Sequence, residues 1–206
     1  MVISIIALLI AILLPALRQA RMAAASIQCA SNQRQLILAY TMYADDNQEY
    51  LPLWFGPSRP SSYGASHQFY LIDAAPYLQG DDVHQCSASS DHGSVLGRQV
   101  SIGYNFHLGF RDGGGWYAPP YYMPHRTGQI RQPSRFVMTA DKRPPSTSTG
   151  WISGGVFINE RWNTPVDPGM ILPRHVNNGA SLGFLDGHVE TVEEGRWGSF
   201  TWTQPQ

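Results

Sequence analysis

The sequence predicts an α+β protein in which a long N-terminal helix packs against an antiparallel β-sheet head. Three observations support this fold class. Residues 1–17 form an uncharged apolar run, and residues 18–47 continue with helical periodicity. Residues 48–206 are rich in glycine, proline, aromatic residues and short alternating runs. We therefore divide the chain into an apolar helix half (1–17), an amphipathic helix half (18–47) and a globular head (48–206).

The apolar half has no polar face. Ser4 is the only polar side chain before Arg18, and isoleucine and leucine would occupy every side of the helix. Such a helix lies either in lipid or inside a large core, and about 17 residues is the lower limit for crossing a bilayer. Because a head of this size cannot enclose it, we expect a retained membrane helix. A cleaved signal peptide is disfavoured, since no basic residue precedes the run.

The amphipathic half is expected to continue the same helix and to lie along the head. Polar residues begin at Arg18 without a helix breaker. One stripe then recurs at steps of three and four: Met22, Ser26, Cys29, Gln33, Leu36, Tyr40 and Tyr43. This spacing is typical of a half-buried helix, which should end near Asp45-Asp46-Asn47.

Both ends of the chain resemble a known family. The N-terminal part, VISIIALLIAILLPALRQAR, then Ile27-Gln28-Cys29 and SNQRQLILAYTMYADDNQEYLP, resembles the start of type IV pilins and type II secretion pseudopilins. The C-terminal part resembles the His…Asp-Gly motif of bacterial prepilin-like proteins: Arg174-His175, Asn178-Gly179-Ala180 and Asp186-Gly187-His188. Ten residues separate His175 from Asp186, one more than in the usual pattern.

The resemblance implies a pilin-like fold and a processed N-terminus. The family's basic leader, its cleavage site and a glutamate used in assembly would all lie upstream of Met1. We therefore expect this chain to be truncated at the leader.

Cys29 and Cys86 are the only cysteines. In an exported head, two cysteines most simply form one disulfide, which would tie the helix to the head. The alternative is one buried free thiol and a second, unrelated one. A zinc site would need two more ligands, and although His84 and His92 flank Cys86, the spacing matches no standard zinc pattern.

Small residues in the apolar half are candidates for packing between helices. Ala7, Ala11 and Ala16 would let neighbouring helices approach closely. Pro15 removes one backbone hydrogen bond and loosens the preceding turn. It either assists side-by-side packing or only marks the lipid boundary.

The head should contain a short helix or turn and several strands. We expect the helix within 69–78, strands at 100–106, 136–140 and 151–158, and a hairpin over 180–192. Asp186-Gly187 lies between the two alternating runs of that hairpin and predicts a two-residue type I′ turn.

The C-terminal hairpin also holds candidate metal ligands. His175, Asp186 and His188 offer imidazole and carboxylate groups, which suit zinc, iron or calcium. Ca²⁺ is the ion that the resemblance favours. The turn alone explains Asp186, however, so we expect no resident metal and no other cofactor. The chain has no G-x-S-x-G motif and no activated cysteine, which favours a protein that is not an enzyme.

An aromatic loop over residues 111–124 is a candidate binding surface. Its rings would either cover the sheet as a satellite core or bind protein or sugar. They belong to Trp116, Tyr117, Tyr121 and Tyr122.

Charge and resemblance together define the expected function. The net charge is −1 and the arginines form no basic stripe, which excludes nucleic acid as a partner. The resemblance implies a structural subunit of a pilus or pseudopilus filament. Such a subunit would self-associate, lie in the membrane and contact secretion or pilus assembly machinery. The alternative is a membrane-anchored monomeric module that binds glycan or protein through the aromatic loop.

The expected location is the inner membrane, with the head exported to the periplasm or cell surface. Arg18 and Arg21 alone would favour a cytoplasmic head. A basic leader upstream would restore the bias toward export.

Overall fold

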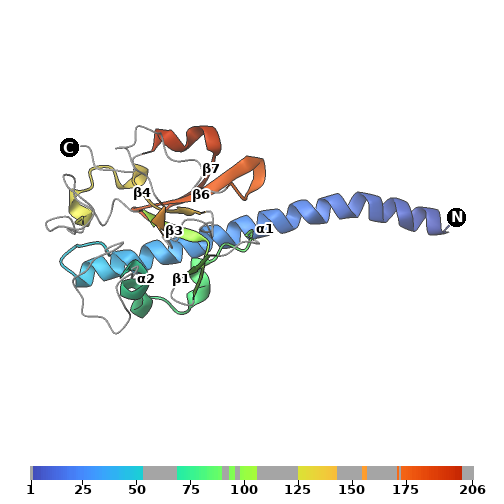
Figure 1. Ribbon diagram of the computed structural model, residues 1–206. Coiled ribbons are helices and arrows are strands. Elements are labelled where there is room, and N and C mark those ends of the chain that lie inside the picture. The colour runs from blue at the N-terminus through green and yellow to red at the C-terminus, as the bar shows by residue number, and fades with distance from the viewer. Residues whose placement is uncertain are drawn as a thin grey trace, which may run out of the picture.

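The computed structural model describes residues 2–52, 69–89, 93–95, 98–105, 125–142, 155–156, 171 and 173–200. One long helix, α1 (Val2–Asp46), dominates it. The C-terminal half of α1 lies against the head, and its N-terminal half projects away from the head (Figure 1). The fold class is α+β, as the sequence predicts, because the head is built on a β-sheet.

The main sheet has five strands in the order β5-β3-β4-β6-β7. Four of them pair in antiparallel fashion: β3 (Ile102–Asn105), β4 (Val137–Asp141), β6 (Gly179–Phe184) and β7 (Val189–Glu193). The predicted antiparallel pairing thus holds for four strands, and the edge strand β5 (Gly155–Val156) adds to β3 in parallel. A separate two-stranded sheet joins β1 (Gly93–Val95) to β2 (Arg98–Val100).

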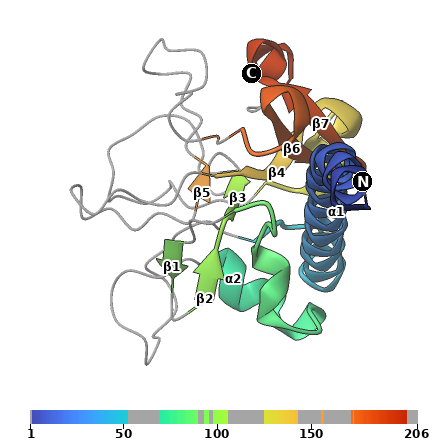
Figure 2. The ribbon, with the colours of Figure 1, turned by 90° about the vertical axis from the view of Figure 1, so that its right-hand side faces the viewer.

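Short helices complete the described head. The expected helix within 69–78 is confirmed as α2 (Phe69–Ala74), followed by the 3₁₀ turn η1 (Ala75–Tyr77). The remaining 3₁₀ turns are η2 (Asp81–His84), η4 (Thr127–Gln129), η5 (Pro133–Arg135), η7 (Val176–Asn178) and η8 (Glu194–Ser199). The head half of α1 runs between the sheet and the segment that contains α2 (Figures 1 and 2).

The buried face of α1 follows the predicted stripe. The buried residues of α1 are Cys29, Gln33, Leu36, Ile37, Ala39, Tyr40 and Ala44. The Tyr40 ring packs against that of Tyr104 on β3, with centroids 4.7 Å apart. Met22, the first residue of the predicted stripe, is 40% exposed, because the helix has not yet reached the head at that point.

The turn between β6 and β7 differs from the predicted type I′ turn. That turn needs positive φ at both central residues, but here only Gly187 has it, at +91°. The Gly187 N–H donates to the Phe184 carbonyl, and the Phe184 N–H donates to the His188 carbonyl. The loop therefore has three residues, and glycine takes the third position, where a left-handed residue is needed. Asp186 accepts from the His188 N–H (3.2 Å), which fixes the turn.

Close approach of α1 to β6 depends on Gly183. A Cβ atom there would lie 2.3 Å from Thr139 Oγ1, 2.6 Å from Ile37 Cδ1 and 3.0 Å from Gln33 Oε1. Any side chain at this position would therefore push α1 away from the sheet.

We expect Gly183→Ala to destabilise the head by about 1–3 kcal/mol because the added methyl overpacks this contact. Urea unfolding of the full chain in mild detergent measures the effect. The matched control is Gly195→Ala, where a Cβ meets nothing within 4 Å, and the expected change is within about 0.5 kcal/mol. Equal stabilities for the two variants would contradict the close approach.

Candidate functional site

The projecting part of α1 is an apolar surface that the described head leaves uncovered. Residues 2–24 are all exposed, and at 1.5 Å per residue they extend about 34 Å. Within residues 2–17 the large apolar side chains range from 48% exposed at Ile10 to 83% exposed at Ile3. This segment is long and apolar enough to span a membrane, and none of it is buried.

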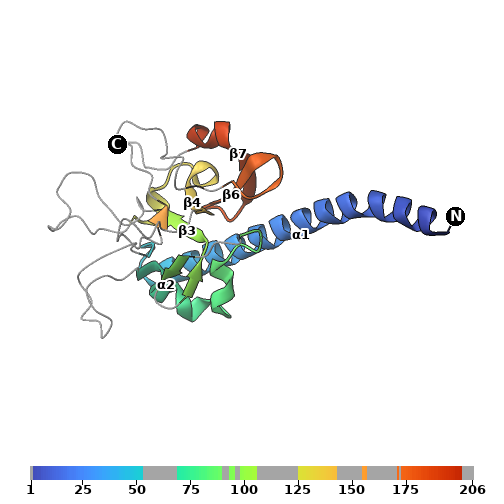
Figure 3. The ribbon, with the colours of Figure 1, turned by 45° about the vertical axis from the view of Figure 1, so that its right-hand side comes forward.

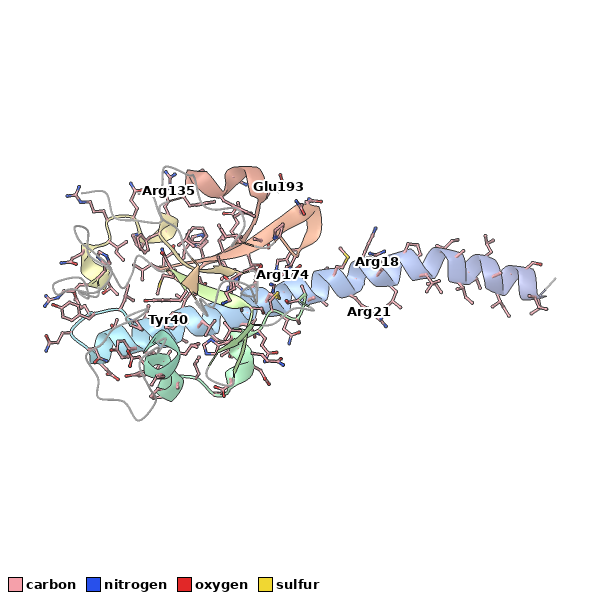
Figure 4. All side chains as sticks on the ribbon, viewed as in Figure 1. Arg18, Arg21, Tyr40, Arg135, Arg174 and Glu193 are labelled. Atoms are coloured by element: carbon pink, nitrogen blue, oxygen red, sulfur yellow. A yellow bond between two sulfur atoms is a disulfide. The ribbon has the colours of Figure 1, made fainter. Side chains whose placement is uncertain are left out.

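Two arginines mark where the apolar surface ends. Arg18 and Arg21 project from α1 between the apolar segment and the head (Figure 4). Long basic side chains can keep their charge in water while their stems cover apolar surface. The apolar stretch from Val2 to Leu17 is about 24 Å long, so these arginines lie where a bilayer interface would be.

Pro15 lies inside α1, and the helix continues on both sides of it. The ribbon curves smoothly through this half (Figure 3). The other predicted packing residues, Ala7, Ala11 and Ala16, are all exposed on the projecting part. They are therefore available to contact another helix.

A second feature lies where α1 first meets the head. Six polar or sulfur-bearing side chains from four segments converge there, and we call them the junction cluster: Ser26, Cys29, Gln33, Cys86, Asp141 and His175. All except the half-buried Ser26 are buried. The cluster joins α1 to both of the layers that it packs against.

The predicted disulfide is present between Cys29 and Cys86. It links α1 to the loop that follows η2, across a sequence separation of 57 residues. Closing a loop of this length stabilises the folded state by about 4 kcal/mol in the chain-entropy model.

Asp141, at the end of β4, is the centre of the cluster. Its Oδ2 accepts from the Ser181 N–H at 2.8 Å and lies 2.8 Å from His175 Nε2. Its Oδ1 lies 3.5 Å from Gln33 Nε2. A buried carboxylate is costly unless it is paired and hydrogen-bonded, and here three groups from three segments surround it.

Gln33 connects α1 to two strands at once. Its side-chain amide donates to the Ser181 carbonyl on β6 at 3.0 Å, and its Oε1 accepts from Thr139 Oγ1 on β4 at 3.1 Å. A buried amide in the middle of the helix face thus fixes both the rotation and the height of α1 on the sheet.

His175 contacts the cluster through both ring nitrogens. Nδ1 lies 2.8 Å from Ser26 Oγ. Nε2, which faces Asp141, also lies 3.7 Å from Cys86 Sγ. The order Ser26–His175–Asp141 has the residue types of a hydrolase triad. However, Ser26 Oγ is also 3.1 Å from the Met22 carbonyl of its own helix. The contacts therefore fit a structural joint.

The candidate metal ligands predicted from the sequence are divided between two places. Asp186 Oδ1 and His188 Nδ1 pair at 2.5 Å in the exposed hairpin turn. His175 pairs with Asp141 instead. Within the described residues, no group of potential ligands combines His175 with Asp186 and His188.

The aromatic loop with Trp116, Tyr117, Tyr121 and Tyr122 lies outside the described residues. So does His92, the expected neighbour of Cys86, and so do all residues of the expected strand 151–158 except Gly155–Val156. The binding hypothesis for the loop stays a prediction.

Sequence reasoning did not single out Asp141 or Gln33 as site residues. The sequence does point to Gln33, because it lies in the stripe of α1 that is predicted to be buried, and a buried amide needs polar partners. Asp141 directly follows the predicted strand 136–140. A charged residue in that position usually indicates the start of a loop. It lies within β4 and is fully buried.

Lys142, next to Asp141, is also buried, with 2% exposure. Its backbone carbonyl accepts from the Arg174 guanidinium. Burial, and secondarily the charge of Arg174, lowers the pKa of the Lys142 ammonium to about 8.

Comparison with models of known protein families, with curated proteins and with solved structures finds no match to this chain. The arrangement itself, a long N-terminal apolar helix on an antiparallel sheet, is loosely pilin-like.

We expect His175→Ala to destabilise the head by about 3–5 kcal/mol, because it leaves the buried Asp141 carboxylate without its imidazole partner. Urea unfolding measures the change. His188→Ala removes the other Asp–His pair, whose side chains are 42% and 35% exposed, and should cost less than about 1 kcal/mol. Similar losses in the two variants would contradict a stabilising joint at Asp141.

We also expect stability to rise between about pH 8 and pH 10 because of Lys142. The folded state releases this proton near pH 8, whereas the unfolded chain keeps it to about pH 10.4. The unfolded state therefore binds more protons in this window, so raising the pH favours folding. The free energy of unfolding of the wild type, measured by urea unfolding relative to that of Lys142→Met, should increase as the pH rises. A difference that is constant from pH 7 to pH 9.5 would contradict this.

Proposed function

We propose that this protein is a membrane-anchored, pilin-like structural subunit that assembles into a filament through its N-terminal helix. The observation that carries the proposal is the exposed apolar part of α1, residues 2–17, which the described part of the head does not cover. Exposed apolar surface of this size marks a membrane or a protein interface. The apolar surface would first be buried in the membrane and then in contacts between subunits of the filament.

Insertion into a bilayer supplies the first cover for this surface. Eleven isoleucine, leucine and valine side chains lie exposed between Val2 and Leu17. At about 0.3–0.6 kcal/mol each, they favour insertion by about 5 kcal/mol before Ser4 and Pro15 are counted. Arg18 and Arg21 would set the depth at the interface.

Packing against other copies supplies the second cover. At about 100° per residue, Ala7 and Ala11 lie on one side of α1, and Ala16 and Ala20 lie on nearly the opposite side. Small residues four apart allow helices to approach closely. Two opposite faces can contact two different neighbours, and head-to-tail contacts of this kind generate open helical assemblies.

The junction cluster supports the same proposal, because a filament needs the head to be held firmly to the helix that forms its core. The disulfide, Gln33 and Asp141 hold α1 to both of its flanking layers. The head would be non-enzymatic. Its partners would be further copies, the membrane and assembly or secretion machinery, with the head on the exported side, where the disulfide is stable.

We expect the full chain to remain with membranes after alkaline carbonate extraction. Leu9→Arg should release a large fraction of the protein, because an arginine at the helix centre costs about 3 kcal/mol on insertion. The matched control is Leu38→Arg, at a leucine that is 60% exposed but lies beside the head. The control should stay in the membrane fraction. Retention of both variants would contradict anchoring by residues 2–17.

We further expect α1 to contact two neighbours. In membranes treated with a mild oxidant, the double variant Ala7→Cys with Ala16→Cys should give a ladder of disulfide-linked products, because a head-to-tail contact sets one of these faces against the other face of a neighbour. Each single variant carries a cysteine on one face only and should give little cross-linking. Asp81→Cys, at an exposed head position, is the control and should give little cross-linking. A double variant that stops at the dimer would contradict a filament, and electron microscopy of the cross-linked material provides the direct check.

A further inference from the structure

The junction cluster holds three metal-ligating side chains that the proposed function uses only as structural links. The ligand atoms of Cys29, Cys86 and His175 all lie within 4.8 Å of one another, and all three residues are buried. Among the residues that the structure describes, no other histidine, cysteine or carboxylate group of three meets this condition. In the structure the two sulfurs are bonded to each other.

We propose that the Cys29–Cys86 disulfide is a redox latch on a Zn²⁺ site. When the disulfide is reduced, the two thiolates and His175 Nε2 bind one Zn²⁺ ion, and an oxygen ligand completes the coordination. When the disulfide forms, the site is lost. This inference does not depend on filament assembly.

The distances fit a tetrahedral zinc ion. Zn–S bonds of about 2.3 Å and Zn–N bonds of about 2.0–2.1 Å place sulfur and nitrogen about 3.6 Å apart in a tetrahedron. Cys86 Sγ and His175 Nε2 are 3.7 Å apart. Once unbonded, the sulfurs need to separate to about 3.8 Å, which a small rotation of each cysteine side chain provides.

The surroundings of His175 orient it for this role. With Zn²⁺ on Nε2, the Nδ1–H donates to Ser26 Oγ, 2.8 Å away, and the Ser26 hydroxyl donates to the Met22 carbonyl. Histidines that bind metals typically donate their other N–H in this way. The Asp141 carboxylate, 2.8 Å from Nε2, exchanges this hydrogen bond for one to a water in the fourth position.

The chemistry of the ligands selects the ion. Two thiolates and an imidazole favour zinc over calcium or magnesium, which prefer oxygen ligands. This differs from the calcium site that the resemblance suggested near the C-terminal hairpin.

The redox step balances with a dithiol partner. A dithiol reductant gives two electrons and two protons to the Cys29–Cys86 bond, which becomes two thiols, and the reductant becomes a disulfide. Zn²⁺ binding then releases the two thiol protons to solvent. In the reverse direction, an oxidising disulfide accepts the two electrons, the S–S bond reforms and Zn²⁺ leaves.

The test compares the full chain in mild detergent, oxidised and reduced, without oxygen. A phosphine reductant opens the disulfide without adding thiols. Co²⁺ alone is the first probe, and Zn²⁺ in competition with a chromophoric chelator is the second. We expect the reduced chain to bind one equivalent, with thiolate-to-cobalt charge-transfer bands and tetrahedral visible bands. We also expect it to bind Zn²⁺ at least 100-fold more tightly than the oxidised chain does.

Variants identify the ligands. His175→Ala should weaken Zn²⁺ binding by the reduced chain at least tenfold, and the double variant Cys29→Ser with Cys86→Ser should abolish the charge-transfer bands. His188→Ala, at an exposed histidine paired with Asp186, is the matched control and should bind as the wild type does. Near-UV circular dichroism checks that each variant is folded. If His175→Ala fails that check, Ser26→Ala takes its place, with a smaller expected loss of affinity.

Two results would overturn the proposal. One is equal Zn²⁺ affinity for the oxidised and reduced wild-type chains, which needs no variant. The other is a folded His175→Ala chain that binds Zn²⁺ as tightly as His188→Ala does.

Discussion

A buried carboxylate fixes how the long helix sits on the sheet. Asp141 is fully buried, and its oxygens face His175, the Ser181 backbone and Gln33, which come from three different segments. A charge without these groups would cost several kcal/mol in such a place. The helix therefore cannot slide or rotate by one residue without leaving a polar group unpaired. Gly183 allows the helix to come this close to β6, because a Cβ there would collide with Thr139 and Ile37.

The two halves of α1 meet opposite requirements within one continuous helix. The head half has a buried face that ends in polar contacts, whereas the projecting half is apolar on every side. No described break separates them, and Pro15 lies within the helix. The contacts of the junction cluster therefore also determine the position and orientation of the projecting half relative to the head. For a subunit that packs through this helix, the geometry of the head relative to its neighbours would be set at Gln33 and Asp141.

Much of this architecture follows from sequence periodicity. The stripe from Cys29 to Tyr40 is buried as its spacing predicts, and the apolar run that precedes it is exposed. The strands around residues 102–105 and 137–141 lie where alternation and apolar content place them. The disulfide was also predictable, because the chain contains only two cysteines.

The parts that were not predictable depend on contacts between distant segments. Asp141 reads as a loop residue from its neighbours, and only the approach of α1 and His175 makes it part of the core. The parallel pairing of β5 with β3 depends on a long connection that carries no local signal. The dipeptide Asp186-Gly187 is compatible with both a two-residue and a three-residue hairpin loop. The hydrogen bonds between Phe184 and His188 and between Gly187 and Phe184 show that the loop has three residues.

The covalent link at the base of the head also determines how the molecule would carry tension. A pulling force that enters along α1 reaches Cys29 and crosses directly to Cys86. The 57-residue interval between them is bypassed, which withholds roughly 200 Å of contour length from extension. The helix residues Gln33 and Tyr40, which contact strands of the sheet, lie inside that bypassed interval. Stretching a chain of such subunits would therefore load the C-terminal strands first and leave the clamped helix until the bridge is broken.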